Sequence, residues 1–344
     1  MKTTILASLF ALVIAPLAEA QCVGDIAVDA RVDGGDLGVL LANWGPVTST
    51  SLSRACDLDG NALVNGADLG MLLANWGACP VLTWATVLEA QPDPLAVTDP
   101  GIRAAIQSTG LPWRVRDNGT GIEMLLVPHG NFQMGCIMAS TAYGCPYWEL
   151  PVHAVTLTNA FYLGRYEVTQ GQWVAKMGSN PSRFQGLEGS PDRPVEQVSW
   201  TGIQSFFATT GFRLPTESEW EYACRAGTQT PFYNGSADDD TVGGLAWYAS
   251  NSGSESHVVG GRAPNALGFY DMVGNAWEWV SDWWGDYAAS AQVNPIGPEV
   301  GTDRVLRGGS WRYALTDALR SSSRGLVPSG VLGDDVGFRV ARNP

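Results

Sequence analysis

The chain has 344 residues, enough for two domains, and its formal net charge is −14 at pH 7. A charge of this sign argues against binding to nucleic acid or to anionic lipid, because both ligands require a surface rich in lysine and arginine. The 14 tryptophans and 41 glycines are typical of a compact, turn-rich domain held by aromatic clusters.

Residues 1–20 have the pattern of a secretory signal peptide. Lys2 supplies the positive start, residues 5–17 are mostly apolar, and residues 18–20 form an A-x-A cleavage site. The apolar segment is too short to span a membrane, and no later stretch reaches about 18 apolar residues. We therefore expect an exported protein without a membrane span, either secreted or held at the cell surface.

Six cysteines in an exported chain predict disulfide bonds. Cys136 and Cys145 would close a short loop, and Cys56 would brace the first part of the chain through Cys79 or Cys22. Six cysteines permit about 15 pairings, so the connectivity stays open.

An internal repeat follows, in which residues 36–45 (DLGVLLANWG) recur as residues 68–77 (DLGMLLANWG). Each copy begins at the last residue of an acidic loop. In the second loop, residues 57–68, side-chain oxygens occupy loop positions 1, 3, 5, 9 and 12, and position 7 offers a backbone carbonyl. This is the ligand spacing of an EF-hand-type calcium loop. The six predicted calcium ligands are Asp57, Asp59, Asn61, Leu63, Asn65 and Asp68.

The first loop, residues 25–36, is less complete. It keeps acidic residues at positions 1, 5, 9 and 12, but Ala27 stands at position 3 and Ala30 stands where the sharp turn prefers glycine. We expect this site to be weaker or empty. For both loops, the alternative is a solvated acidic face without a metal. The candidate ligands of the first loop are Asp25, Asp29, Asp33 and Asp36.

Apolar residues follow each loop at helical spacing, which predicts two helices, each with one buried face and an Asn-Trp-Gly stop. These residues are Leu37, Leu40, Leu41 and Trp44 in one copy and Leu69, Leu72, Leu73 and Trp76 in the other. Two such loop–helix units, with aspartate at loop position 12, resemble dockerins. The resemblance implies docking to a cohesin-like or other cell-surface protein, and an intramolecular clamp is the alternative.

Residues 80–120 are expected to link two domains and to contain one short helix over residues 102–108. Further along, the patterns predict strands over residues 124–128, 131–135, 153–157 and 161–169. Helices are expected over residues 170–177 and 200–209, and a third begins after Thr216, which forms a capping box with Glu219.

Three blocks of the large domain occur in order: residues 213–222 (RLPTESEWEY), 274–284 (GNAWEWVSDWW) and 307–311 (RGGSW). They resemble the formylglycine-generating enzyme, or sulfatase-modifying factor, family, and the resemblance covers residues 121–343. It implies an α/β, elaborated C-type-lectin-like fold rich in irregular chain. The expected organisation is a signal peptide (1–20), a small all-α dockerin-like calcium domain (21–79), a linker (80–120) and the sulfatase-modifying-factor domain (121–344).

The oxidising members of this family bind copper through two cysteines that closely follow the Gly-Gly-Ser block. The matching positions are Tyr313 and Ala318, which cannot supply the thiolates that Cu(I) requires, and no cysteine follows Cys224. We therefore expect no copper and no catalytic residue. The family's disulfide partner of Cys224 falls at Ser323, so Cys224 is expected to be a small buried core residue.

Related sulfoxide synthases bind iron through three histidines, partly in an extra helical domain. That domain is missing here, and the three histidines of this chain show no clustered spacing. We expect each to be a surface or hydrogen-bonded residue. They are His129, His153 and His257.

The family's structural calcium sites have oxygen ligands that carry over to this sequence. At one site, the resemblance implies carboxylates from Asp271 and Glu278, with a salt bridge as the alternative role of Glu278. Backbone carbonyls would come from Gly274 and Ala276. The second site begins at Asn251 and Ser252, but its later ligands fall in a loop that is shorter here.

The function predicted from these features is a non-oxidising, calcium-stabilised binding module at the cell surface, with a peptide or glycan ligand. The first alternative is an enzyme, either sulfatase-maturing or with another chemistry in the same cleft; the second is a purely structural surface protein. Five tryptophans could form core or line a ligand groove: Trp277, Trp279, Trp283, Trp284 and Trp311. Three acids are expected on a solvated helix side or in ion pairs with Arg213 and Arg225: Glu217, Glu219 and Glu221.

Overall fold

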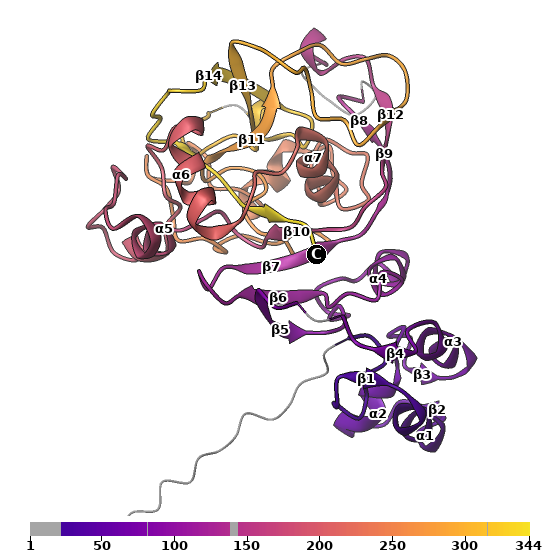
Figure 1. The fold of residues 1–344 in the computed structure, drawn as a ribbon. Helices are drawn as coiled ribbons and strands as arrows, with labels where there is room; N and C mark the ends of the chain where they lie inside the picture. Colours follow the sequence, from indigo (N-terminus) through magenta and orange to yellow (C-terminus); the bar gives the residue numbers. More distant parts are fainter. Residues whose placement is uncertain (1–21, 81, 138–143, 315) are drawn as a thin grey trace, which may run out of the picture.

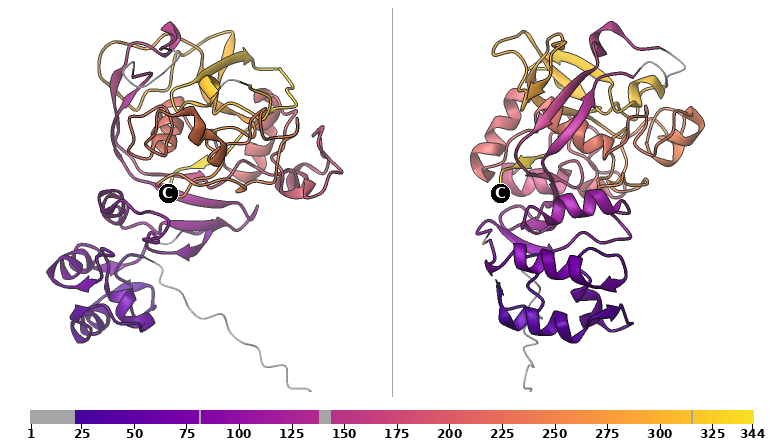
Figure 2. Two further views of the ribbon diagram at one scale, coloured as in Figure 1. Left: turned by 180° about the vertical axis from the view of Figure 1, so that it is seen from behind. Right: turned by 90° about the vertical axis from the view of Figure 1, so that its right-hand side faces the viewer.

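The computed structural model describes residues 22–80, 82–137, 144–314 and 316–344, so the expected signal peptide lies outside the described residues. A small N-terminal module lies at one end, and a larger domain holds most of the chain (Figure 1). Helix α4 and strands β5 and β6 lie between them in all three views (Figures 1 and 2). No helix in the described part of the chain has the length and apolar character to cross a membrane.

The N-terminal module contains two similar loop–helix units. Its elements are α1 (Gly34–Ala42), α2 (Ser51–Cys56), α3 (Gly66–Ala74) and the two-residue strands β1 (Arg31–Val32), β2 (Gly45–Pro46), β3 (Leu63–Val64) and β4 (Gly77–Ala78). β1 pairs with β4, and β2 pairs with β3, so each unit is tied to the other. The last loop residue, Asp36 or Asp68, closes a capping box at the start of its helix.

Two disulfide bonds show how four of the six cysteines are paired. Cys22 pairs with Cys79, which closes the N-terminal module, and Cys136 pairs with Cys145 as expected. The expected bridge from Cys56 is wrong, because Cys56 is a free, fully buried thiol. The module is therefore braced from end to end, and Cys56 packs as a small core residue.

The apolar faces of α1 and α3 are only partly buried. Leu40 and Leu72 are inaccessible to solvent, whereas Leu41 and Leu73 are each 51% exposed. The tryptophans at the helix ends, Trp44 and Trp76, are each 50% exposed. The expectation of one buried face per helix is wrong for these four residues. The next residue along a helix points about 100° away, so burying Leu40 turns Leu41 outward.

The expected linker at residues 80–120 is largely part of the large domain. Its strands β5 (Ala85–Glu89) and β6 (Arg114–Asp117) extend an antiparallel sheet with β7 (Glu123–Val127), β10 (Phe161–Gly164) and β16 (Ala341–Arg342), in the order β16-β10-β7-β6-β5. Trp113 and Val115 are buried in the core, which explains why this segment is not free. The expected helix of this segment is present as α4 (Pro100–Gln107).

The rest of the large domain is a mixed α/β arrangement with much irregular chain. A four-stranded sheet contains β14 (Arg324–Pro328), β13 (Asp303–Arg307), β11 (Trp277–Trp283) and β15 (Val336–Gly337), in that order. A three-stranded sheet contains β12 (Gln292–Val293), β9 (His153–Leu157) and β8 (Gly130–Met134). The helices are α5 (Gln170–Met177), α6 (Trp200–Thr210) and α7 (Glu217–Arg225).

Most sequence-predicted elements are confirmed within one or two residues, including the capping box of Thr216 and Glu219 at the start of α7. The strand expected over residues 161–169 is shorter, because β10 ends at Gly164. Gly164 and Arg165 instead accept hydrogen bonds from buried Arg339. That contact turns the chain out of the sheet before α5.

Buried ion pairs connect these elements. Glu221 on α7 has no exposed surface and is bound by Arg225 at 2.8 Å and by Arg307 on β13. Glu217, one turn earlier, is bound by Arg324 on β14 at 2.6 Å. The solvated-face alternative is therefore wrong for Glu217 and Glu221, whereas the expected pairing of Glu221 with Arg225 is confirmed.

We predict that Glu221→Gln lowers the free energy of unfolding by about 3–5 kcal/mol, because it leaves the buried Arg225 without a carboxylate and Arg307 with only the 3.5 Å contact to Glu217. The matched control is Arg116→Gln, which breaks the half-exposed pair of Arg116 with Glu123 and should cost less than about 1 kcal/mol. Urea unfolding of both variants measures the difference. Equal losses would contradict the assignment of Glu221 as a central ion-pair partner.

Candidate functional site

The second acidic loop brings three carboxylates to one point. The ligand oxygens of Asp57, Asp59 and Asp68 lie within 4.8 Å of one another, and among the described residues this is the only such group of histidine, cysteine and acidic side chains. Asp68 is fully buried and is held by backbone N–H groups of Leu58 at 2.6 Å and Asn65 at 2.7 Å. Burial and the neighbouring Asp57 raise the pKa of Asp59. This arrangement suits a hard cation.

The first loop has the same backbone hydrogen bonds to its last aspartate as the second loop, but it does not have the cluster of three carboxylates. Asp36 accepts from the backbone N–H groups of Ala27 at 2.7 Å and Asp33 at 2.8 Å, as Asp68 does in its own loop. Asp25 is buried, and Asp29 and Asp33 are more accessible. The metal roles of these four acids and of Asn61, Leu63 and Asn65 stay predictions.

Strain at the sharp turn does not distinguish the two loops. Ala30 in the first loop has a φ of 66°, and Ala62 has a φ of 67° at the same position of the second loop. Both alanines therefore carry the same left-handed cost. The expected difference in affinity thus rests on Ala27, which stands where the second loop has Asp59.

The second loop also contacts the bridge to the large domain. The side-chain amide of Gln107 on α4 donates a hydrogen bond to the carbonyl of Leu58, between two of the predicted ligands. Gly60 lies against Arg103 of the same helix, with a backbone φ of 70°. No local sequence pattern predicts this contact, because α4 lies about 40 residues beyond the loop.

The positions that correspond to the copper cysteines hold no metal ligands. Tyr313 is 41% exposed, and its ring meets that of Trp277 edge-on, with 5.4 Å between ring centroids. Ala318 lies in the short 3-10 helix Thr316–Leu319. The tyrosine therefore covers Trp277 from the solvent side.

Cys224, on α7, is fully buried, and burial raises its pKa to about 12. The expectation that it is a core residue is confirmed. The position of its expected disulfide partner is occupied by the buried Ser323. The thiol is therefore protonated at neutral pH and unsuited to binding metal.

The three histidines lie on separate elements. His129 is exposed, His153 is buried on β9, and His257 stacks on Trp247 with 3.7 Å between ring centroids. None belongs to a group of three potential metal ligands among the residues that the structure describes.

Three buried acids surround one buried arginine near the predicted calcium ligands of the large domain. Both oxygens of Glu278 bind Arg339 at 2.6 Å, so the salt-bridge alternative for Glu278 is present in the structure. Asp271 accepts from the N–H of Gly260 through Oδ2, while its buried Oδ1 has no hydrogen-bond partner. Glu167, which sequence reasoning missed, accepts from the N–H of Ala276 at 2.9 Å.

Negative charge exceeds positive charge in this cluster, because three buried carboxylates face one buried guanidinium group, and only Asp271 also feels the more accessible Arg262. Burial and the nearby acids raise the pKa of Glu167 well above its usual range. Burial likewise raises the pKa of Asp271 to about 6. Local sequence patterns do not point to Glu167, because it lies more than 100 residues before Asp271.

The remaining predicted ligands have local structural roles. At Gly274, an added Cβ would lie 2.5 Å from the carbonyl of Trp247, so the turn between the two acids requires glycine there. The side chain of Asn251 bonds to the backbone of Ala246 at 3.0 Å, and that of Ser252 bonds to the carbonyl of Trp311 at 2.9 Å. Their metal roles, like that of the Ala276 carbonyl, stay predictions.

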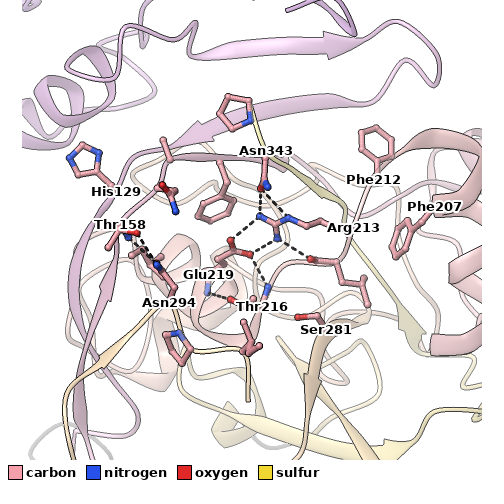
Figure 3. Close-up of a pocket in the computed structure, with 18 of the residues that line it drawn as sticks. His129, Thr158, Phe207, Phe212, Arg213, Thr216, Glu219, Ser281, Asn294 and Asn343 are labelled. Atoms are coloured by element: carbon pink, nitrogen blue, oxygen red, sulfur yellow. Dashed lines mark hydrogen bonds and ion pairs between the residues drawn. The ribbon is translucent and has the colours of Figure 1, made fainter. Parts of the chain in front are cut away.

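A cavity of about 1000 Å³ has a lining that does not include Tyr313, and Figure 3 shows part of this lining. Arg213 reaches into it and binds Glu219 at 2.6 and 2.9 Å and Asn343 at 2.9 Å, which confirms the expected pair with Glu219. Phe207 and Phe212 form one side of the cavity. The charges of Arg213 and Glu219 therefore neutralise each other next to the aromatic rings of Phe207 and Phe212.

The tryptophans of the family blocks divide between core and surface. Trp277, Trp279 and Trp311 are at most 5% exposed, so the core interpretation is confirmed for them. Trp283 and Trp284 are only half-buried, and both stack against arginines. They remain available to line a groove.

Comparison with known proteins identifies relatives of the large domain. The family described as Sulfatase-modifying factor enzyme 1-like domain matches residues 113–344. Chaperone protein LppX of Paenibacillus barcinonensis is 32% identical over 247 residues, which cover 55% of this chain and 82% of LppX. The formylglycine-generating enzyme of Bos taurus is 37% identical over 187 residues, which cover 49% of this chain and 50% of that enzyme.

Solved structures that share the fold include the following two. Treponema denticola variable protein 1 has 32% sequence identity and a TM-score of 0.58, and the match covers 65% of this chain and 95% of that one. PvdO from Pseudomonas aeruginosa has 28% identity and a TM-score of 0.57, with 67% and 98% covered. The family match begins at residue 113 and therefore includes β6. The expected linker, residues 80–120, had placed this strand outside the large domain.

We predict that Asp68→Ala weakens calcium binding about 10-fold or more, whereas Asp36→Ala has a smaller effect. The two variants are matched, because both aspartates hold equivalent backbone N–H groups and only Asp68 belongs to the three-carboxylate cluster. Losing a charged ligand interaction costs about 1.5–3 kcal/mol. Calorimetric calcium titration measures both affinities. Equal losses would mean that the loops are equivalent.

Proposed function

This chain belongs to the sulfatase-modifying factor enzyme family, and we propose that it is a non-oxidising, calcium-stabilised binding module exported to the cell surface. The observation that carries the proposal is the pair of residues at the copper positions, Tyr313 and Ala318. Without thiolates the site cannot hold Cu(I), and the remaining free thiols, Cys56 and Cys224, are buried apart. The expected C-type-lectin-like fold is consistent with the mixed α/β architecture and its structural relatives.

We predict that the full chain does not convert cysteine to formylglycine. The test incubates it with a Cys-x-Pro-x-Arg peptide, copper and oxygen, and follows the peptide by mass spectrometry. The formylglycine-generating enzyme of Streptomyces coelicolor serves as the positive control. Turnover that survives in metal-depleted protein would favour the alternative, an enzyme that uses a different site in the same cleft.

Calcium is the ion that the donor sets support best. In the large domain, the orphaned buried Oδ1 of Asp271 and the excess of carboxylates over Arg339 both favour an additional cation. Asp271 and the carbonyls of Gly274 and Ala276 would hold it, while Glu278 would share its charge between the cation and Arg339. Oxygen ligands of this kind suit calcium, which would neutralise the cluster.

We predict that a chelator lowers the melting temperature of the Asp68→Ala variant, in which the second acidic loop is disabled. Adding Asp271→Asn should remove most of this effect, because asparagine still accepts from Gly260 but lacks the charge. At free calcium 100 times the dissociation constant, the stabilisation would be about 2.7 kcal/mol. Glu278→Gln is a poorer probe, since it also breaks the pair with Arg339. Identical melting with calcium and chelator would refute this site.

Two surfaces are proposed for binding. The exposed leucines and tryptophans of α1 and α3 form a repeated apolar surface, which supports docking to a cohesin-like or other cell-surface protein. The cavity in Figure 3 suits an uncharged peptide segment or a glycan, because its central Arg213–Glu219 pair is neutral and its wall carries aromatic rings.

A further inference from the structure

A second cavity, of about 380 Å³, adjoins the one in Figure 3 and shares Asn294, Pro295 and Ile296 with it. The start of α7, the end of β11 and the segment 295–298 line it. The hydroxyl of Ser218 on α7 donates a hydrogen bond to the carbonyl of Pro295 at 3.2 Å, and Gly297 lies against Asp282 on β11. The lining segments are therefore held to one another.

Asp282 on β11 contributes a buried carboxylate to this cavity. Its residue is only 3% exposed, and Oδ2 accepts from the N–H of Glu217 at 2.8 Å and from the hydroxyl of Ser281 at 2.9 Å. Oδ1 accepts no hydrogen bond from any described residue, but it keeps some accessible surface. A donor that enters the cavity can therefore reach it, and a hydrogen bond to a charged acceptor is stronger than one between neutral groups.

Neither of the two neighbouring arginines forms an ion pair with Asp282. Arg324 binds Glu217 at 2.6 and 2.8 Å. Arg304 is stacked between the rings of Trp200 and Trp283, at 3.6 and 3.4 Å from their centroids, and its charge acts on Asp282 only across a longer distance. Within the described structure, Asp282 therefore has no ion-pair partner.

The number of free carboxylate oxygens determines which kind of cation this cavity can bind. Only one oxygen of Asp282 is available, so a planar guanidinium has no second acceptor for its usual two-bond contact, whereas a compact ammonium group needs only one. A divalent metal fits poorly, because one free carboxylate oxygen falls far short of the roughly six to eight oxygen ligands that calcium takes. The volume also leaves room for the chain that carries the ammonium group.

We propose that this cavity binds a primary alkylammonium group, which donates a hydrogen bond to Oδ1 of Asp282 while its methylene chain lies along Pro295 and Pro298. Two sources share this chemistry: a free small amine, and a lysine side chain of another protein. The site is separate from the calcium clusters and from Tyr313, so it goes beyond the function proposed above.

Because Asp282 must be ionised to bind an ammonium group, the affinity of the site should depend on pH. Burial raises its pKa to about 7, and the charge of Glu217 adds to the rise. Binding an ammonium requires the carboxylate form, so affinity should increase from pH 5.5 to 8, while the amine, with a pKa of about 10.4, stays protonated. The titratable or charged groups on neighbouring segments are His153, Glu217, Glu219, Asp286, Tyr287, Arg304 and Arg324.

The test uses the full chain in calcium and measures binding of n-butylamine and n-butanol by NMR titration. We expect butylamine to bind and butanol not to bind. Asp282→Asn should weaken butylamine binding about 10-fold or more, as expected for losing a charged hydrogen bond. The control Asp286→Asn removes an exposed acid at the rim and should change affinity less than about 5-fold.

A second arm compares acetylated tripeptides with a central lysine or glutamine. Binding of the lysine peptide assigns the site to a protein partner, and binding of butylamine alone assigns it to a free amine. Equal binding of butylamine and butanol, or unchanged affinity in Asp282→Asn, overturns the proposal. If that variant does not fold, the wild-type pH profile decides, since an affinity that does not rise towards pH 8 also overturns it.

Discussion

Four glutamates of the large domain are almost inaccessible to solvent, and each is bound by an arginine 61 to 171 residues away. The pairs are Glu149–Arg320, Glu217–Arg324, Glu221–Arg307 and Glu278–Arg339. A domain with short strands and much irregular chain has few backbone ladders to fix its loops. The buried ion pairs fix the loops instead, because a charge that is removed from water is costly unless it keeps its partner. The pairing of α7 with β13 and β14 therefore fixes the frame on which both cavities are built.

The same constraint explains where an additional cation would be stabilised. Arg339 also donates to the carbonyl groups of Gly164 and Tyr270, so it is a shared centre for several loops. It compensates Glu278 but leaves Glu167 and Asp271 in a buried region with too little positive charge. Calcium at this point would complete a polar core that arginine alone leaves negative.

The N-terminal module is coupled to this frame through α4. Gln107 contacts the carbonyl of Leu58, and the buried Arg103 faces Gly60, so the second acidic loop rests on a helix that also packs on the large domain. The exposed apolar residues of α1 and α3 lie elsewhere on the module and stay available for a partner.

The sequence by itself determined the elements and motifs that depend on neighbouring residues. The helix over residues 170–177, the capping box at Thr216, the family blocks and the absence of the copper thiolates are all local patterns, set by hydrophobic period, caps and residue identity. Only the tertiary structure decided which side chains become buried partners. Glu167, Arg339 and Asp282 come from separate parts of the chain, and their roles depend on distance and burial, which local sequence does not encode. For the same reason the division of the α1 and α3 faces into buried and exposed leucines, and the membership of β5 and β6 in the sheet, required the folded chain.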